Sequence, residues 1–220
     1  MTQPFFITGT DTGVGKTVLT ALLVKFLRER GENAAALKPV CSGGRADAQK
    51  LLAAMGGALT LDEINPWHFR TPIAPALAAR KENQRVKLSQ VLAHVRAMQK
   101  RFEVLLIEGA GGLMSPLGEN FDSRDLIVAL RATPIIVAQN KIGAVNHVLL
   151  TLEALPKNLR ANARVVLMSQ PDPDASAETN PGLLAELTEA NTFLLPWLEG
   201  NLFDIKSPRV RRTLRALAGF

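Results

Sequence analysis

A glycine-rich loop between a predicted strand and a predicted helix constrains this chain more than any other feature. The segment Gly9-Thr10-Asp11-Thr12-Gly13-Val14-Gly15-Lys16-Thr17 follows an apolar run at residues 5–7 and precedes apolar side chains at helical spacing. A strand, a glycine-bearing loop, Gly-Lys-Thr and a helix in this order are typical of a phosphate-binding loop, whose backbone N–H groups face the phosphates. The first glycine of the usual motif is Thr10 here, and Gly9 stands one place early. An ordinary glycine loop is therefore the alternative.

Two side chains at the end of this loop have a chemistry that suits a nucleotide. We expect Lys16 to place a positive charge near the β- and γ-phosphates. We expect the Thr17 hydroxyl to occupy one position around Mg²⁺. Both residues stand at the predicted start of a helix that runs from Gly15 to Arg30.

Unbroken apolar runs, rather than alternating ones, predict strands that are buried on both faces of a parallel sheet. Helical patterns between these runs give a repeated strand-then-helix order, which predicts an α/β fold with helices on both faces of the sheet. We expect one P-loop NTPase-like domain over residues 1–220. The predicted strands span residues 5–8, 34–37, 104–107, 134–138, 165–168 and 192–195, and the helices 15–30, 47–55, 88–100 and a basic C-terminal segment around 209–217.

Two segments have no clear periodicity. Residues 58–86 contain three X-Pro steps and are interpreted as a long loop or a loop with a helix, which could cover a substrate. Residues 170–180 are rich in Pro, Asp, Ser and Asn and are interpreted as a loop.

Polar side chains follow the predicted strands, where ligands of open α/β sheets bind. Glu108 ends an apolar strand and suits Mg²⁺, although it could instead cap the next turn. Lys38 ends another strand, and a second lysine near the phosphate loop suggests a second anion; a surface lysine is the alternative. Asp47 could reach the metal or serve as an ordinary acid at a helix start. Cys41 is interpreted as a packed residue, not a nucleophile.

Composition excludes several classes of protein. No stretch approaches the ~18 unbroken apolar residues of a membrane span. The N-terminus shows no secretory signal and a single cysteine permits no internal disulfide, so we expect a cytoplasmic protein without membrane contact. The net charge of +6 comes largely from arginines near the C-terminus, which no aromatic residues accompany. We therefore expect no nucleic-acid binding.

Three motifs together resemble the dethiobiotin synthetase family of biotin biosynthesis. They are the phosphate loop from Gly9 to Thr17, then Lys38-Pro39-Val40-Cys41-Ser42-Gly43, and then Glu108-Gly109-Ala110-Gly111-Gly112. Lesser similarities include Asn65-Pro66-Trp67 and Pro196-Trp197-Leu198, so that the resemblance spans about residues 5–200. It implies that ATP, CO₂ and 7,8-diaminononanoate form a carbamate, then a carbamoyl-phosphate anhydride, and finally a cyclic urea.

The resemblance also implies roles for individual residues. Lys16 and Lys38 would be catalytic, and a homodimer would complete the site through residues 143–150. Mg²⁺ would be held by Thr17, Asp47 and Glu108. The diamine and its carbamate would contact Thr12, Lys38, Ser42 and Gly111. ATP would contact Gly13, Val14, Gly15, Lys16, Thr17, Val18, Asp47, Glu108, Gly109, Ala110, Gly111, Ser169, Gln170, Pro196, Trp197 and Leu198.

Two departures from the family pattern bear on recognition. Family members usually carry Asn-Asp after the fifth strand to read adenine, whereas this chain has Ser169-Gln170. The chain also lacks tyrosine, which some relatives use on the substrate carboxylate. Two other functions stay open: a related ATP-dependent amidoligase, and a nucleotide-switched ATPase. The switch proteins carry a lysine early in the phosphate loop, where this chain has Thr10-Asp11-Thr12.

Overall fold

A six-stranded parallel sheet forms the centre of the molecule. The computed structural model describes residues 3–198 and 205–219. The strand order is β2-β5-β1-β6-β7-β8, with every pair parallel. The strands are β1 (Phe5–Gly9), β2 (Ala34–Leu37), β5 (Val104–Glu108), β6 (Thr133–Gln139), β7 (Arg164–Met168) and β8 (Asn191–Leu195). The predicted parallel sheet is confirmed, including its sixth strand.

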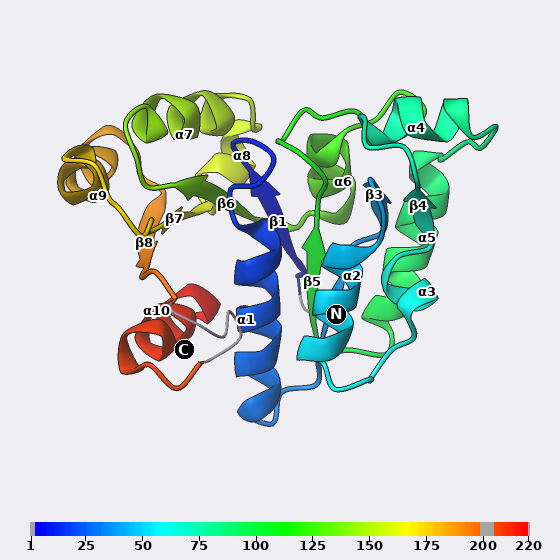
Figure 1. The fold of residues 1–220 in the computed structure, drawn as a ribbon, viewed down its shortest axis with the longest axis horizontal. Helices are drawn as coiled ribbons and strands as arrows, with labels where there is room; N and C mark the ends of the chain where they lie inside the picture. The colour runs from blue at the N-terminus through cyan, green and yellow to red at the C-terminus, as the bar shows by residue number, and fades with distance from the viewer. Residues whose placement is uncertain (1–2, 199–204, 220) are drawn as a thin grey trace.

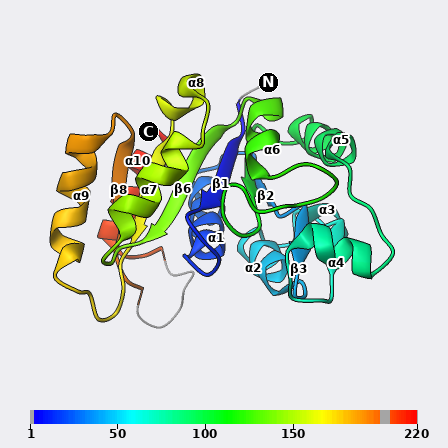
Figure 2. The same ribbon diagram turned by 90° about the horizontal axis from the view of Figure 1, so that it is seen from above.

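Helices cover both faces of this sheet because its central strands are apolar throughout. Phe6, Ile7, Leu106 and Ile136 are fully buried. Figure 1 shows the sheet from one face, and Figure 2 shows α1 and α2 on one side of it and α5, α6 and α8 on the other. The helices of ten residues or more are α1 (Lys16–Glu29), α5 (Leu88–Gln99), α7 (Ala144–Glu153), α9 (Ser176–Leu187) and α10 (Pro208–Ala218). The shorter ones are α2 (Ala46–Ala54), α3 (Leu61–Ile64), α4 (Pro75–Lys81), α6 (Ser123–Leu130) and α8 (Lys157–Arg160).

A second, two-stranded sheet stands beside the main one. It pairs β3 (Val40–Ser42) with β4 (Trp67–Phe69) in parallel. The segment 58–86 is thus built from α3, β4 and α4 as well as loops, which extends the prediction of a loop with a helix. Its short elements bring the loop after Arg70 next to Ser42 and Gly43.

The prediction of a loop over residues 170–180 is wrong in its second half, because α9 begins at Ser176. The Asp174 carboxylate accepts hydrogen bonds from the backbone N–H and the hydroxyl of Ser176, which fixes the helix start. Asn180 is buried and donates to Asn140 Oδ1 at 2.9 Å. Tertiary contacts therefore override the unfavourable helix propensity of Asn and Pro here. The helices α6, α7 and α8 were not predicted.

Candidate active site

The phosphate loop joins β1 to α1 in a conformation that only glycine adopts readily. Gly13 and Gly15 have φ angles of 74° and 102°, which lie in the left-handed region. A Cβ on Gly15 would come within 2.9 Å of the Met168 side chain at the end of β7. The loop is therefore held close against the carboxyl edge of the sheet. Lys16 and Thr17 are the first two residues of α1, at this edge.

Lys16 is a buried cation at the loop. Its side chain folds back, and Nζ donates to the Asp11 carbonyl oxygen at 2.7 Å. Burial and the nearby charge of Lys38 lower the pKa of Lys16 from 10.5 to about 8. The carboxylates of Glu108, Asp47 and Asp11 offset these two effects only in part. An anionic ligand beside Lys16 would stabilise its charged form further.

Lys38, just past β2, lies among acidic groups. Its Nζ donates to Glu108 Oε1 at 2.7 Å and lies 3.3 Å from Asp47 Oδ2. Lys38 is 4% exposed, and burial favours its neutral form. The two carboxylates outweigh burial and raise the pKa of Lys38 above its ordinary value. Lys38 is therefore a buried, positively charged ammonium, and the alternative interpretation as a surface lysine is excluded.

Glu108 connects Lys38 to the phosphate loop. Its Oε1 also accepts a 2.6 Å hydrogen bond from the Thr17 hydroxyl. Its other carboxylate oxygen, Oε2, is buried without a hydrogen-bond partner. A buried carboxylate oxygen left unpartnered is costly in free energy. This oxygen could accept from a metal-bound water or contact a cation directly.

Thr17, Asp47 and Glu108 are brought together as the sequence predicted. Burial raises the pKa of the Asp47 carboxyl, but the Lys38 ammonium and a hydrogen bond with Thr17 outweigh this, so that its pKa is lowered overall. Hydroxyl and carboxylate oxygens are the ligands that Mg²⁺ prefers, and Mg²⁺ commonly takes only one or two carboxylates together with phosphate oxygens. The donor set fits that ion. The described residues contain no group of three or more His, Cys, Asp or Glu side chains that could hold a metal ion.

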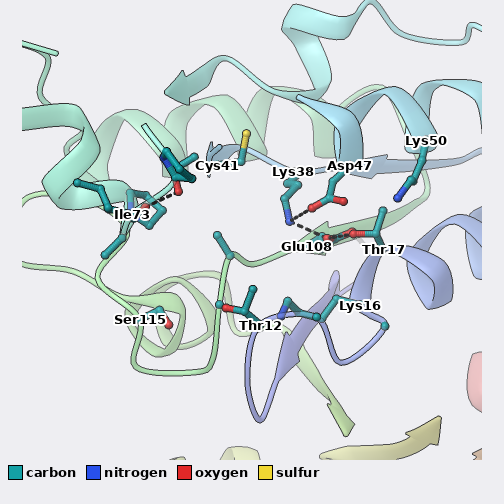
Figure 3. A pocket seen from close by; sticks show the side chains of 18 of the residues that line it. Thr12, Lys16, Thr17, Lys38, Cys41, Asp47, Lys50, Ile73, Glu108 and Ser115 are labelled. Carbon is teal, nitrogen blue, oxygen red and sulfur yellow. Dashed lines mark hydrogen bonds and ion pairs between the residues drawn. The ribbon is translucent and has the colours of Figure 1, made fainter. Parts of the chain in front are cut away.

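These residues line one cavity of about 640 Å³. Figure 3 shows Lys38, Asp47, Glu108 and Thr17 together, with Thr12 and Lys16 facing them from the phosphate loop. The cavity is open at the carboxyl edge of the sheet, which is where open α/β folds bind ligands. Of the predicted residues, the cavity is lined by Thr12, Gly13, Gly15, Lys16, Thr17, Val18, Lys38, Ser42, Asp47, Glu108, Ala110 and Gly111.

Ser42 and Gly111 line the cavity, and each lies against another residue of the chain. The Ser42 hydroxyl donates to the Ile73 carbonyl oxygen at 2.5 Å. Gly111 has a φ of 69°, and a Cβ there would lie 2.3 Å from Ser115 Oγ. The glycine thus permits the loop after β5 to fold against Ser115. Val14 and Gly109 do not line the cavity, although both lie within the two predicted loops.

Five further residues predicted to contact ATP lie beside one another, outside the residues that line this cavity. The backbone N–H of Ser169 donates to the Leu195 carbonyl oxygen at 2.9 Å, which brings Gln170 near Pro196, Trp197 and Leu198. The Gln170 amide nitrogen donates to the carbonyl oxygens of Met168 and Ser169 at 2.9 and 3.3 Å. None of these five predicted residues lines the cavity described above. Trp197 is 47% exposed.

The cavity also contains residues that the sequence did not single out as ligands. Lys50 lies one turn after Asp47 on α2, and in Figure 3 it is drawn beside Thr17. Ser115 and Pro116 follow the predicted glycine segment. The apolar residues 72–75 line the cavity next to them, since the Ala76 backbone N–H donates to the Pro116 carbonyl oxygen at 3.2 Å. Helical spacing from Asp47 could have identified Lys50. Nothing local marks Ser115.

Cys41 lines the cavity as a packed thiol. It is 3% exposed, and its Sγ donates to the Gly44 carbonyl oxygen at 3.1 Å. Burial raises the pKa of the thiol above its ordinary value. A protonated thiol is a poor nucleophile, which agrees with the interpretation made from the sequence.

Comparison with known proteins gives a consistent result. A family model described as an AAA domain matches residues 3–200. The chain is 40% identical over 218 residues to the ATP-dependent dethiobiotin synthetase BioD of Anaeromyxobacter dehalogenans strain 2CP-C, covering 96% of this chain and 94% of the relative. It is 35% identical to the protein of the same name from Bacillus velezensis over 192 residues, covering 84% and 82%.

A solved structure supports the fold. The MinC:MinD cell division protein complex of Aquifex aeolicus contains a chain that matches all of this chain and 97% of its own length, with a TM-score of 0.60 and 15% sequence identity. At that identity the likeness concerns the fold alone, which is that of a P-loop NTPase. The sequence relatives carry the functional assignment: the chain belongs to the ATP-dependent dethiobiotin synthetase family.

Proposed function

We propose that the chain closes the ureido ring of dethiobiotin from 7,8-diaminononanoate and CO₂, while ATP is converted to ADP and phosphate. The observation that carries this proposal is the meeting of two buried lysines, Lys16 at the end of the phosphate loop and Lys38 just past β2, in one cavity. Nucleotide binding alone calls for one of them. A second fixed cation suits a reaction in which two anions must approach each other.

The chemistry follows from that need. One amine of the substrate takes up CO₂ as a carbamate, and a carbamate oxygen attacks the γ-phosphorus of ATP, releasing ADP. The second amine then attacks the carbonyl carbon of the mixed anhydride, closes the ring and expels phosphate. Lys38 would hold the carbamate and Lys16 the transferred phosphoryl group, so that their charges offset the repulsion between the two anions.

Residues around the two lysines would bind the remaining groups. Thr12, Ser42 and Gly111 would contact the diamine and its carbamate, for which Ser42 must release the Ile73 carbonyl oxygen or accept a hydrogen bond. Ser169, Gln170 and residues 196–198 would receive the base. The Gln170 amide nitrogen donates to two carbonyl oxygens, and its side-chain oxygen could accept from an exocyclic amine of the base.

We propose Mg²⁺ as the cofactor, held by Thr17, Asp47 and Glu108 together with phosphate oxygens. Bound there, the ion would neutralise charge on the β- and γ-phosphates. The unpartnered Glu108 Oε2 supports this placement. Thr17 and Lys38 both bond to Glu108 Oε1 and keep that carboxylate oriented.

We further propose a single-domain, cytoplasmic enzyme that works as a homodimer, with residues 143–150 contributing to the partner's site. Ile142, just before this segment, and Leu150, its last residue, are 77% and 61% exposed. An interface here would cover these two apolar side chains. No helix in the described ranges is long and apolar enough to cross a membrane.

Incubation with the diamine, labelled bicarbonate and Mg-ATP tests the proposal. Mass spectrometry should find dethiobiotin with one labelled carbon in the ring. ATP turnover without the diamine would instead favour the nucleotide-switched ATPase. Glutamine-dependent amide formation on another acid would favour the amidoligase.

A further inference from the structure

We infer that Asn65 is a positioning residue for this reaction, because its buried side-chain amide holds in place both the backbone of Lys38 and the start of the helix that carries Asp47. The inference rests on the proposed role of Lys38. Asn65 lies just after α3, in the segment that has no clear sequence pattern, and it is fully buried.

The first contact fixes the Lys38 peptide. Asn65 Nδ2 donates to the Lys38 carbonyl oxygen at 2.7 Å. The Lys38 backbone N–H donates to the Ile64 carbonyl oxygen at 3.0 Å. Lys38 stands beyond the end of β2, and Asn65 is the one donor that the described residues offer to its carbonyl oxygen. Consecutive residues of one segment thus hold both sides of Lys38.

The second contact fixes the start of α2. Asn65 Oδ1 accepts from Arg45 Nε at 3.3 Å, and the Asn65 carbonyl oxygen accepts from Arg45 Nη2 at 3.0 Å. Arg45 is the residue before α2, and Asp47 stands two positions later. Asn65 therefore links the chain on which Lys38 stands to the helix on which Asp47 stands.

The chemistry of the side chain explains why asparagine is needed. The Lys38 carbonyl oxygen requires a donor, and the Arg45 guanidinium requires an acceptor. An amide offers one of each at a fixed spacing. These two partners, together with the Cys41 thiol that also donates to Asn65 Oδ1 at 3.3 Å, determine its orientation. Aspartate would keep the acceptor and lose the donor, and alanine would lose both. The distance of 3.3 Å between Lys38 Nζ and Asp47 Oδ2 depends on this link.

Replacement of Asn65 by alanine tests the inference in the full-length protein. We expect Asn65→Ala to bind ATP with unchanged stoichiometry and within about twofold of the original Kd, while kcat falls about 10- to 100-fold, the size that a misplacement of about 1 Å causes. Turnover is followed as radiolabelled bicarbonate that enters dethiobiotin. Should Asn65→Ala not fold, Asn65→Asp provides the same comparison.

Asn180→Ala is the matched control. Asn180 is also buried, and its amide donates to Asn140 Oδ1 and to the Lys141 carbonyl oxygen, away from Lys38. It should lower the unfolding temperature and leave kcat within about twofold. A general loss of packing would affect both variants alike.

The double variant Lys38→Ala/Asn65→Ala decides whether Asn65 acts through Lys38. If it does, the double variant is as slow as Lys38→Ala alone, within about twofold. A normal kcat in Asn65→Ala, or a loss that multiplies on top of Lys38→Ala, would overturn the inference. Two other outcomes would instead refute the proposed function and remove the role that Asn65 supports. The first is that the unmodified protein shows no diamine-dependent turnover, and the second is that Lys38→Ala has a normal kcat.

Discussion

Lys38 Nζ and Glu108 Oε1 lie 2.7 Å apart, although the two residues are 70 positions apart in the chain. They meet because β2 and β5 are neighbours in the sheet and both end at the same edge. The ion pair is buried, since the two side chains are 5% and 0% exposed. A buried pair of this kind contributes little net stability but costs much when one partner is lost. Its position beside the phosphate loop makes it the centre of the proposed site.

Lys38→Ala should leave ATP binding nearly intact and lower kcat about 10²- to 10³-fold, the usual effect of removing a charge that acts mainly in the transition state. Titration calorimetry with ATP and steady-state turnover measure the two effects separately. Lys100→Ala, at the exposed end of α5, is the control and should change neither. Equal losses in ATP affinity and turnover would assign Lys38 to the nucleotide.

Lys16→Met should stabilise the ligand-free protein at pH 7 and weaken ATP binding. Burial and Lys38 lower the pKa of Lys16 to about 8, so the folded state holds this proton less tightly than the unfolded chain. The resulting destabilisation is complete below about pH 8 and disappears as the pH rises toward the unfolded value of 10.5. A shift of one pKa unit corresponds to about 1.4 kcal/mol, so this destabilisation is on the order of 3 kcal/mol. Lys16→Met removes it but also loses the hydrogen bond to Asp11, which costs about 1 kcal/mol.

Chemical denaturation at two pH values measures this effect. The free energy of unfolding of Lys16→Met should exceed that of the unmodified protein by about 2 kcal/mol at pH 7. Near pH 10.5 this advantage should be gone, and the lost hydrogen bond should leave the variant less stable by up to about 1 kcal/mol. A variant less stable than the parent at pH 7 would contradict the account. So would a stability difference that grows with pH.

Glu108→Gln should raise the Mg²⁺ concentration needed for half-maximal turnover at least about 10-fold, because a neutral amide attracts the cation less than a carboxylate does. Magnesium titrations of kcat at saturating ATP provide the measurement. The control is Glu153→Gln, which removes a carboxylate from an exposed pair with Arg160. An unchanged magnesium requirement would place the metal elsewhere.

Gly111→Ala and Gly182→Ala should have opposite effects. A Cβ on Gly111 would meet Ser115 Oγ at 2.3 Å with φ at 69°, and we expect a loss of about 1–3 kcal/mol together with reduced turnover. Gly182 lies within α9 with nothing within 4 Å of its Cβ position, so alanine should stabilise by up to about 1 kcal/mol. Thermal unfolding of the two variants distinguishes these outcomes, and a neutral Gly111→Ala would show that the loop has another conformation.

Much of the fold was predictable because the information is local. The strand before Glu108 is an unbroken apolar run, and such runs are found in parallel strands that are buried on both faces. The convergence of Lys38 and Glu108 then follows from the rule that parallel strands end at one edge. The residue identities at the strand ends were therefore enough to place both residues near the phosphate loop.

What the sequence could not provide depends on tertiary contacts. The strands β3 and β4 have three residues each and too short a pattern to recognise. The first half of α9 contains Asn180 and Pro181, and bonds to distant residues stabilise it. The role of Asn65 becomes visible only when its contacts with Lys38 and Arg45 are known.

The most direct test of the central claim is phosphate release from Mg-ATP and bicarbonate, with and without 7,8-diaminononanoate. We expect release that requires the diamine and equals the amount of dethiobiotin formed, one phosphate per ring. Phosphate release at the same rate without the diamine, or without any dethiobiotin, would contradict the account.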